Sequence, residues 1–127
     1  MFPFAATTED FTVSVQPVYL DGESDFMRRR FVFGYMIRIE NGGSDSVQLL
    51  RRQWLIRDSS GRVEEVEGAG VVGKQPVIEP SAVHTYSSFC VLRTFEGSME
   101  GFYVMERPNG EQFKIAIPRF VLRAAAN

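Results

Sequence analysis

The sequence is poor in the residues on which most catalytic and metal sites depend. It contains one histidine, His84, and one cysteine, Cys90. A single cysteine cannot close a disulfide within the chain, which predicts a reducing compartment and therefore a cytoplasmic protein. Zinc and cobalt sites usually draw several ligands from histidine and cysteine, so no metal site and no cofactor are expected.

Long apolar runs and a strong excess of one charge are also missing. No segment approaches the roughly 20 apolar residues that cross a bilayer, so no membrane insertion is expected. Residues 1–11 lack the basic region and apolar core of a secretory signal. The formal net charge of -2 does not favour nucleic acid as a partner.

Aromatic residues and turn formers are plentiful. Eleven Phe and four Tyr, with eleven Gly and six Pro, favour strands joined by turns. A chain of 127 residues fits one domain with a core of its own. We therefore predict a single domain over residues 1–127.

Several segments alternate apolar residues with other residues, the pattern of a strand with one buried face. Asn41-Gly42-Gly43 predicts a tight hairpin to a partner strand over residues 47–57. Further strands are expected at residues 11–15, which Pro17 marks as an edge or a bulge, and on both sides of Pro108-Asn109-Gly110. In the clearest segment, the residues predicted to face the core are Phe31, Phe33, Tyr35, Ile37 and Ile39.

No segment carries the i, i+3, i+4, i+7 stripe of an amphipathic helix. We count about seven or eight short strands, with turn signals at the spacing of a sandwich. The sequence therefore predicts an all-β protein, an immunoglobulin-like β-sandwich of antiparallel strands.

The segment Glu67–Pro76 reads E-G-A-G-V-V-G-K-Q-P and matches two phosphate-binding patterns, G-x-G-x-x-G and most of G-x-x-x-x-G-K-[ST]. Both patterns need a helix after the glycines, because the N-terminus of that helix holds the phosphate. Here Gln75 replaces the magnesium-binding Ser or Thr, and Pro80 would break a helix begun at Pro76. We expect a loop whose glycines serve tight turns, while weak anion or phosphate binding beside Lys74 stays open.

Five motifs in order resemble the ApaG family. They are L-L-R-R-Q-W-L-I-R-D-x-x-G at 49–61, the glycine-rich segment, Y-S-S at 86–88, G-x-M-x-G-x-Y-x-M at 97–105 and I-P-R-F-V-L at 117–122. The resemblance covers residues 11–122 and implies a fibronectin type III-like sandwich. It also implies a loose association with cobalt tolerance and magnesium efflux, and a role as an interaction module. It supplies no catalytic residue to carry over.

Two clusters contain residue types that can serve catalysis or cation binding. His84 shares strand parity with Tyr86, Ser88 and Cys90, but no nucleophile-elbow pattern accompanies it, so we predict no catalytic residue. The carboxylates that could serve a hard cation are Glu64, Glu65, Glu67 and Glu79. We interpret them as a solvated edge and loop.

Two basic clusters are Arg28-Arg29-Arg30 and Arg51-Arg52. The predicted hairpin would place Arg28–Arg30 near Arg57 and Asp58. We interpret these arginines as a solvated face rather than a nucleic-acid site.

The sequence thus favours a noncatalytic binding or regulatory domain that contacts an unidentified protein partner; the alternative is a phosphate- or nucleotide-binding enzyme using Gly68–Lys74. Loops on a rigid sandwich usually carry recognition, and Arg and Trp are enriched at interface hot spots. A second interpretation stays open, in which Val71 and Val72 plug the end of the sandwich and Trp54 is core. The candidate binding residues are Arg52, Trp54, Gly68, Gly70, Val71, Val72, Gly73, Lys74, Gln75 and Pro76.

Overall fold

The alternating segments form nine β-strands in the computed structural model, which describes residues 2–125. Within these residues the helical structure is one 3-10 turn, η1 (Asp21–Glu23). The all-β prediction is confirmed, and β1 and β6 are strands that the sequence did not indicate. The strands are β1 (Phe4–Thr8), β2 (Phe11–Tyr19), β3 (Phe31–Asn41), β4 (Val47–Asp58), β5 (Val63–Ala69), β6 (Val77–Ile78), β7 (Val83–Leu92), β8 (Glu96–Glu106) and β9 (Gln112–Arg123).

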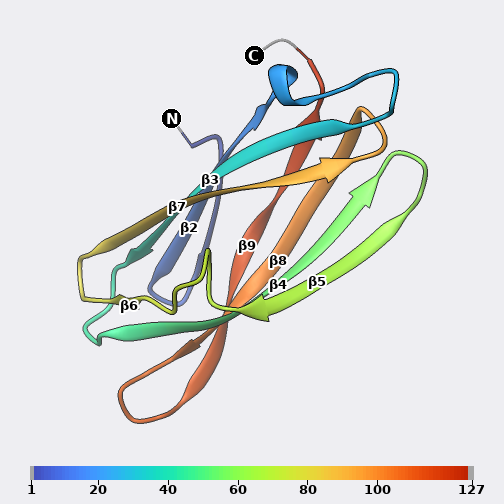
Figure 1. The fold of residues 1–127 in the computed structure, drawn as a ribbon. Helices are drawn as coiled ribbons and strands as arrows, with labels where there is room; N and C mark the ends of the chain where they lie inside the picture. Colours follow the sequence, from blue (N-terminus) through green and yellow to red (C-terminus); the bar gives the residue numbers. More distant parts are fainter. Residues whose placement is uncertain (1, 126–127) are drawn as a thin grey trace.

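The strands form two antiparallel sheets that pack face to face (Figure 1). One sheet has the order β1-β2-β3-β7, and the other has the order β5-β4-β8-β9 with β6 paired to β4. The chain crosses between the sheets three times, from β3 to β4, from β6 to β7 and from β7 to β8. This arrangement is the sandwich of fibronectin type III and immunoglobulin-like domains, as predicted.

The core lies between the sheets, and β3 supplies the face that the sequence indicated. All five predicted inward residues of β3, from Phe31 to Ile39, are buried. Trp54 on β4 is also buried, and its ring centroid lies 5.5 Å from that of Tyr35 and 6.0 Å from that of Phe120. Tilted and edge-on ring contacts of this kind stabilise the core beyond simple burial of area.

The hairpin predicted at Asn41-Gly42-Gly43 is wrong. β3 pairs with β2 and β7, whereas β4 belongs to the other sheet. The buried Asn41 side chain fixes this crossing, because its Nδ2 donates to the carbonyls of Asp45 (2.8 Å) and Ile78 (2.9 Å). The two glycines therefore lie in the loop that carries the chain from one sheet to the other. A sequence pattern typical of turns does not specify which sheet the next strand joins.

One other local prediction is confirmed, and the one for Pro17 holds only in part, because β2 continues through Pro17 to Tyr19. Pro108-Asn109-Gly110 closes the β8–β9 hairpin, with Gly110 at a φ of 89° and the Arg107 N–H donating to the Glu111 carbonyl at 2.8 Å. Pro17 lies on β2 beyond Val15, the last β2 residue that β1 pairs. A missing backbone donor is tolerated there, as it is on an edge strand.

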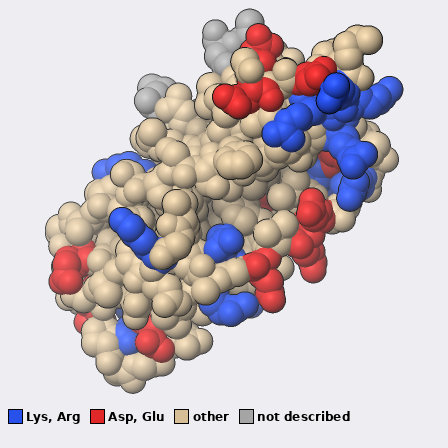
Figure 2. Space-filling model, in the orientation of Figure 1, with Lys and Arg blue, Asp and Glu red and all other residues tan. Residues whose placement is uncertain are grey.

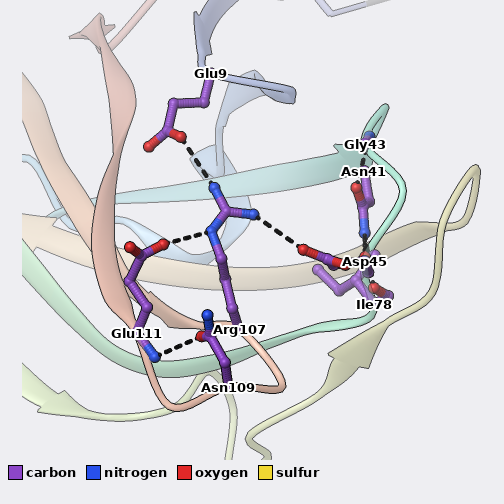
Figure 3. Close-up of polar contacts among 8 residues, drawn as sticks. All are labelled: Glu9, Asn41, Gly43, Asp45, Ile78, Arg107, Asn109 and Glu111. Atoms are coloured by element: carbon purple, nitrogen blue, oxygen red, sulfur yellow. Dashed lines mark hydrogen bonds and ion pairs between the residues drawn. The ribbon is translucent and has the colours of Figure 1, made fainter.

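Figure 3 shows how three loops meet around the Arg107 side chain. Its guanidinium contacts Glu9 at 2.9 Å, Glu111 at 2.9 Å and Asp45 at 3.6 Å, and lies 4.2 Å from the centroid of the Phe113 ring. Glu9, Glu111 and Asp45 belong to the β1–β2, β8–β9 and β3–β4 connections, and Phe113 lies on β9. One arginine therefore fastens one end of the sandwich.

The two long sides of the sandwich differ. On one side, the edge strands β1 and β9 cover each other: the Ala116 N–H donates to Thr8 Oγ1 at 3.0 Å, and the Phe4 and Phe120 ring centroids are 6.2 Å apart. On the other side, the edge strands are β5 and β7. The segment Glu67–Pro76 lies on this second side, which we call the open side.

Candidate functional site

The glycine-rich segment ends in a two-residue turn. Val71 and Lys74 exchange backbone hydrogen bonds of 2.8 and 3.0 Å, and the intervening Val72 and Gly73 have φ values of 47° and 76°. Such turns usually carry Asn-Gly, because both central residues need positive φ. A valine in this conformation is strained by its branched Cβ. The turn nonetheless places Val72 at its tip.

A β-bulge on β4 anchors the loop. The register between β4 and β8 shifts between Leu49 and Arg51, which leaves Leu50 outside the ladder. The Leu50 carbonyl accepts the Gly70 N–H at 2.8 Å and the Gln75 Nε2–H at 3.0 Å. Bulges commonly redirect backbone groups in this way.

Arg52 holds the same loop from the other side. Its Nη1 donates to the carbonyls of Ala69 (3.0 Å) and Gly70 (2.9 Å). The guanidinium lies against Gly68, where an added Cβ would be 2.9 Å from Nη2. A phosphate cradle presents backbone N–H groups, whereas these two carbonyls face a cation of the chain itself. The loop is also followed by the short strand β6 and not by a helix.

A cleft of about 390 Å³ lies between this loop and β7. Val72 is 62% exposed and Phe89 is 63% exposed on its rim, whereas Val71 is 1% exposed. Val71 therefore fills the end of the core, as the second interpretation of the sequence had it, whereas Val72 does not. The lining residues are Tyr35, Arg52, Trp54, Ala69, Val71, Val72, Gly73, Tyr86, Ser87, Ser88 and Phe89.

The structure thus brings together half of the residues that the sequence singled out. Arg52, Trp54, Val71, Val72 and Gly73 all line the cleft. The others support it or lie beside it: Gly68 lies under the guanidinium, Gly70 is buried in the loop, and Lys74, Gln75 and Pro76 do not line the cleft.

Sequence reasoning missed the tyrosine cluster beneath the cleft. The hydroxyls of Tyr86 and Tyr103 are hydrogen-bonded to each other, and Tyr103 is fully buried. Burial raises the pKa of Tyr35, Tyr86 and Tyr103, and the positive charge of Arg52 partly opposes that rise. The three phenols are therefore neutral donors at neutral pH. The inward parity of Tyr35 and Tyr86 was the available signal, since a buried tyrosine hydroxyl needs a partner.

The histidine and cysteine do not form a reactive pair. They lie six residues apart on β7, a separation of roughly 20 Å along a strand. Burial raises the pKa of the Cys90 thiol to about 12, so the thiol stays protonated. Burial first, and then the nearby Lys74, lower the pKa of His84, which is consequently neutral at pH 7.

The remaining charged clusters lie apart from the cleft lining. Among residues 2–125, no group of three or more His, Cys, Asp and Glu side chains is placed to hold a metal ion. Glu67 on β5 pairs with Arg51 at 3.6 Å, and Arg28 pairs with Asp25 at 3.6 Å. Figure 2 shows basic residues gathered at the end of the sandwich where Figure 1 places the β2–β3 connection. Across residues 2–125, no helix is long and apolar enough to span a membrane.

A larger hollow, of about 750 Å³, lies on the outer face of the β2-β3-β7 part of the first sheet. Gly34 stands there between Val18 and Phe89, its register partners on the two neighbouring strands. Because glycine has no side chain, the row is interrupted and the face is concave. No pattern in the sequence indicated this hollow.

Comparison with known proteins gives the family. The ApaG domain model matches residues 21–107. The protein ApaG of Paramagnetospirillum magneticum is 50% identical over 119 residues, which cover 94% of this chain and 92% of that protein. The protein ApaG of Brucella suis is 46% identical with the same coverage. The crystal structure of the ApaA protein from Bordetella pertussis superimposes with a TM-score of 0.87 at 43% identity, over 90% of this chain and 93% of that one. The chain therefore belongs to the ApaG family.

Proposed function

We propose that this chain is a noncatalytic binding or regulatory domain that recruits a protein partner through the cleft on the open side. The observation that carries the proposal is Val72, an exposed apolar side chain held in a strained conformation at the tip of a well-anchored loop. Strain that the surrounding structure maintains is characteristic of functional positions. Phe89, similarly exposed, lies on the opposite rim of the same cleft.

Arg52 has a positioning role in this proposal. Its hydrogen bonds to Ala69 and Gly70 fix the loop and leave little freedom for Val72 to lose on binding. Preorganised contacts bind more tightly because less entropy is lost. The domain would act in the cytoplasm, and its partner would connect it to cobalt tolerance and magnesium efflux, the processes implied by the family resemblance.

The alternative, a phosphate- or nucleotide-binding enzyme using Gly68–Lys74, has less support. The loop directs two carbonyls toward Arg52. The side-chain amide of Gln75 donates a hydrogen bond to the Leu50 carbonyl, and glutamine has no hydroxyl that could bind magnesium. Titration with pyrophosphate and a nucleoside triphosphate, each with and without magnesium, separates the two functions, and we expect no saturable binding.

The proposal is tested by Val72→Asp, with Val77→Asp as its matched control. Val77 is also an exposed valine, at 53%, and lies on the neighbouring β6 outside the cleft lining. Tagged wild-type and variant chains are used to recover partners from the cell that makes the protein, and their melting temperatures are compared. We expect Val72→Asp to lose at least about 90% of a partner that wild type and Val77→Asp both retain, because an unpaired carboxylate opposes burial at a contact.

Equal recovery by all three chains contradicts the proposal. So does a loss that accompanies a lowered melting temperature of Val72→Asp, because the variant would then fail through unfolding.

A further inference from the structure

The edge strand β7 is unprotected in a way that the facing edge strand β5 is not. Exposed strand edges pair with other chains unless charges, proline or a covering segment prevents it. β5 carries Glu64, Glu65 and Glu67 along its seven residues. The ten residues of β7 include no Asp, Glu, Lys, Arg, Pro or Gly. Figure 2 shows a largely uncharged band across the face where Figure 1 places β7.

The free backbone groups of β7 can be assigned from its pairing with β3. The Asn41 N–H donates to the Ala82 carbonyl. The backbone groups of the odd-numbered β3 residues therefore form hydrogen bonds to β7. Their register partners on β7 are the even-numbered residues His84 to Leu92. The odd-numbered residues therefore direct N–H and C=O away from β3, toward the open edge; they are Val83, Thr85, Ser87, Phe89 and Val91.

The neighbouring loop does not use these groups. The backbone hydrogen bonds made by residues 70–76, within the described chain, go to one another and to β4. Val72 and Gly73 border the cleft beside Ser87 and Phe89 without pairing to the strand. Ser87 and Phe89 thus have a cleft beside them rather than a covering strand.

We propose that β7 is the docking edge for a second copy of this chain, which adds its own β7 in antiparallel register about a two-fold axis at Ser87. This register places Val83 opposite Val91 and Thr85 opposite Phe89 of the other copy. Every outward residue then meets an uncharged outward residue, and on the order of ten backbone hydrogen bonds can form. The strand is complementary to itself, as a two-fold interface requires.

The side chains at the same positions favour this occupant. On the outer face, Phe89 and Val91 are 63% and 40% exposed, and Met36 on β3 is 47% exposed. Joining two copies makes one continuous sheet, in which Phe89 packs beside Thr85 and Val91 beside Val83 of the other copy. The interface is centred on one strand and is consequently small, so the dimer is weak and forms at about 10 μM to 1 mM protein.

The experiment uses the purified chain alone and therefore does not depend on the proposed partner. Sedimentation velocity over that concentration range measures the dimer, and amide hydrogen exchange at low and high concentration locates it. We expect a monomer–dimer equilibrium, with Thr85, Ser87 and Phe89 amides protected only at high concentration.

A charge exchange at the axis tests the register. In Ser87→Lys and in Ser87→Glu, each alone, two like charges lie directly opposite, and we expect the dissociation constant to rise about fivefold or more. Mixing the two variants places opposite charges at the axis and restores the dimer. Melting temperatures establish that both variants fold.

Three results overturn the proposal. One is a chain that stays monomeric up to 1 mM, as it would if the edge served a different protein. Another is a dimer whose protected amides lie outside β7. The third is a pair of folded variants that dimerise like wild type, or whose mixture does not regain the dimer.

Discussion

At the scale of single residues, Gly70 and Val72 show two different demands within one turn. Gly70 is buried with a φ of 63°, and an added Cβ would lie 2.1 Å from the Lys74 carbonyl oxygen. Val72 adopts a similar left-handed conformation although it has a branched Cβ. Position 70 requires glycine because a Cβ atom would clash with the Lys74 carbonyl. The backbone at position 72 does not require valine, and its strain suggests that the side chain serves a purpose other than stabilising the fold.

Gly70→Ala should destabilise the protein by about 2–4 kcal/mol, because it combines positive-φ strain with a backbone clash. The measurement is urea unfolding followed by tryptophan fluorescence. Gly73→Ala is the control: Gly73 has a φ of 76° but nothing lies within 4 Å of its Cβ position, so about 1 kcal/mol is expected. Equal losses in the two variants would mean that the Lys74 carbonyl does not constrain position 70.

At the scale of elements, β4 organises the site through two features that lie two residues apart. The Leu50 bulge supplies a carbonyl for the loop, and Arg52 supplies a guanidinium for the carbonyls of Ala69 and Gly70. Both features tie the segment after β5 back onto β4. The position of the cleft rim therefore depends on β4, which also supplies Arg52 and Trp54 to the cleft lining.

Arg52→Ala should lower the free energy of unfolding by about 1–2 kcal/mol, since two charge-assisted hydrogen bonds are lost, of which the one to the Gly70 carbonyl is partly buried. Arg51→Ala is the matched control, because Arg51 is exposed and makes one long contact with Glu67 at 3.6 Å; its loss should stay within about 0.5 kcal/mol. Amide exchange should also accelerate at Val71 and Lys74 in Arg52→Ala alone. The anchoring role is refuted if Arg51→Ala and Arg52→Ala give the same exchange pattern.

The strands were predictable because apolar and other residues alternate along β3, β7 and β9, and this alternation indicates a strand with one buried face. Their partners were harder to predict, because Asn41-Gly42-Gly43 fits both a hairpin and a passage between sheets, and only the buried Asn41 contacts decide between them. At the site, the glycines indicated a loop, but its contact with Arg52 depends on a bulge at Leu50 that leaves no clear trace in the sequence. The tyrosine cluster likewise joins β3, β7 and β8, which no local pattern connects.

At the scale of the whole molecule, the sandwich has one closed side and one open side (Figure 1). β1 and β9 close the first, and the Arg107 contacts fasten one end (Figure 3). The other side carries the anchored loop, the cleft and the uncharged edge of β7. In the proposed binding role, the closed side would supply a rigid frame and the open side an accessible rim.

The most direct test of this account is site-specific photo-crosslinking in the cell that makes the protein. A benzoylphenylalanine is introduced separately at position 72 on the cleft rim, at position 77 on β6 and at position 121 on β9, all of which are exposed valines. The account predicts a discrete adduct with a different protein from position 72 and none from positions 77 and 121. Adducts of the same size from all three positions, or from position 121 alone, would contradict it.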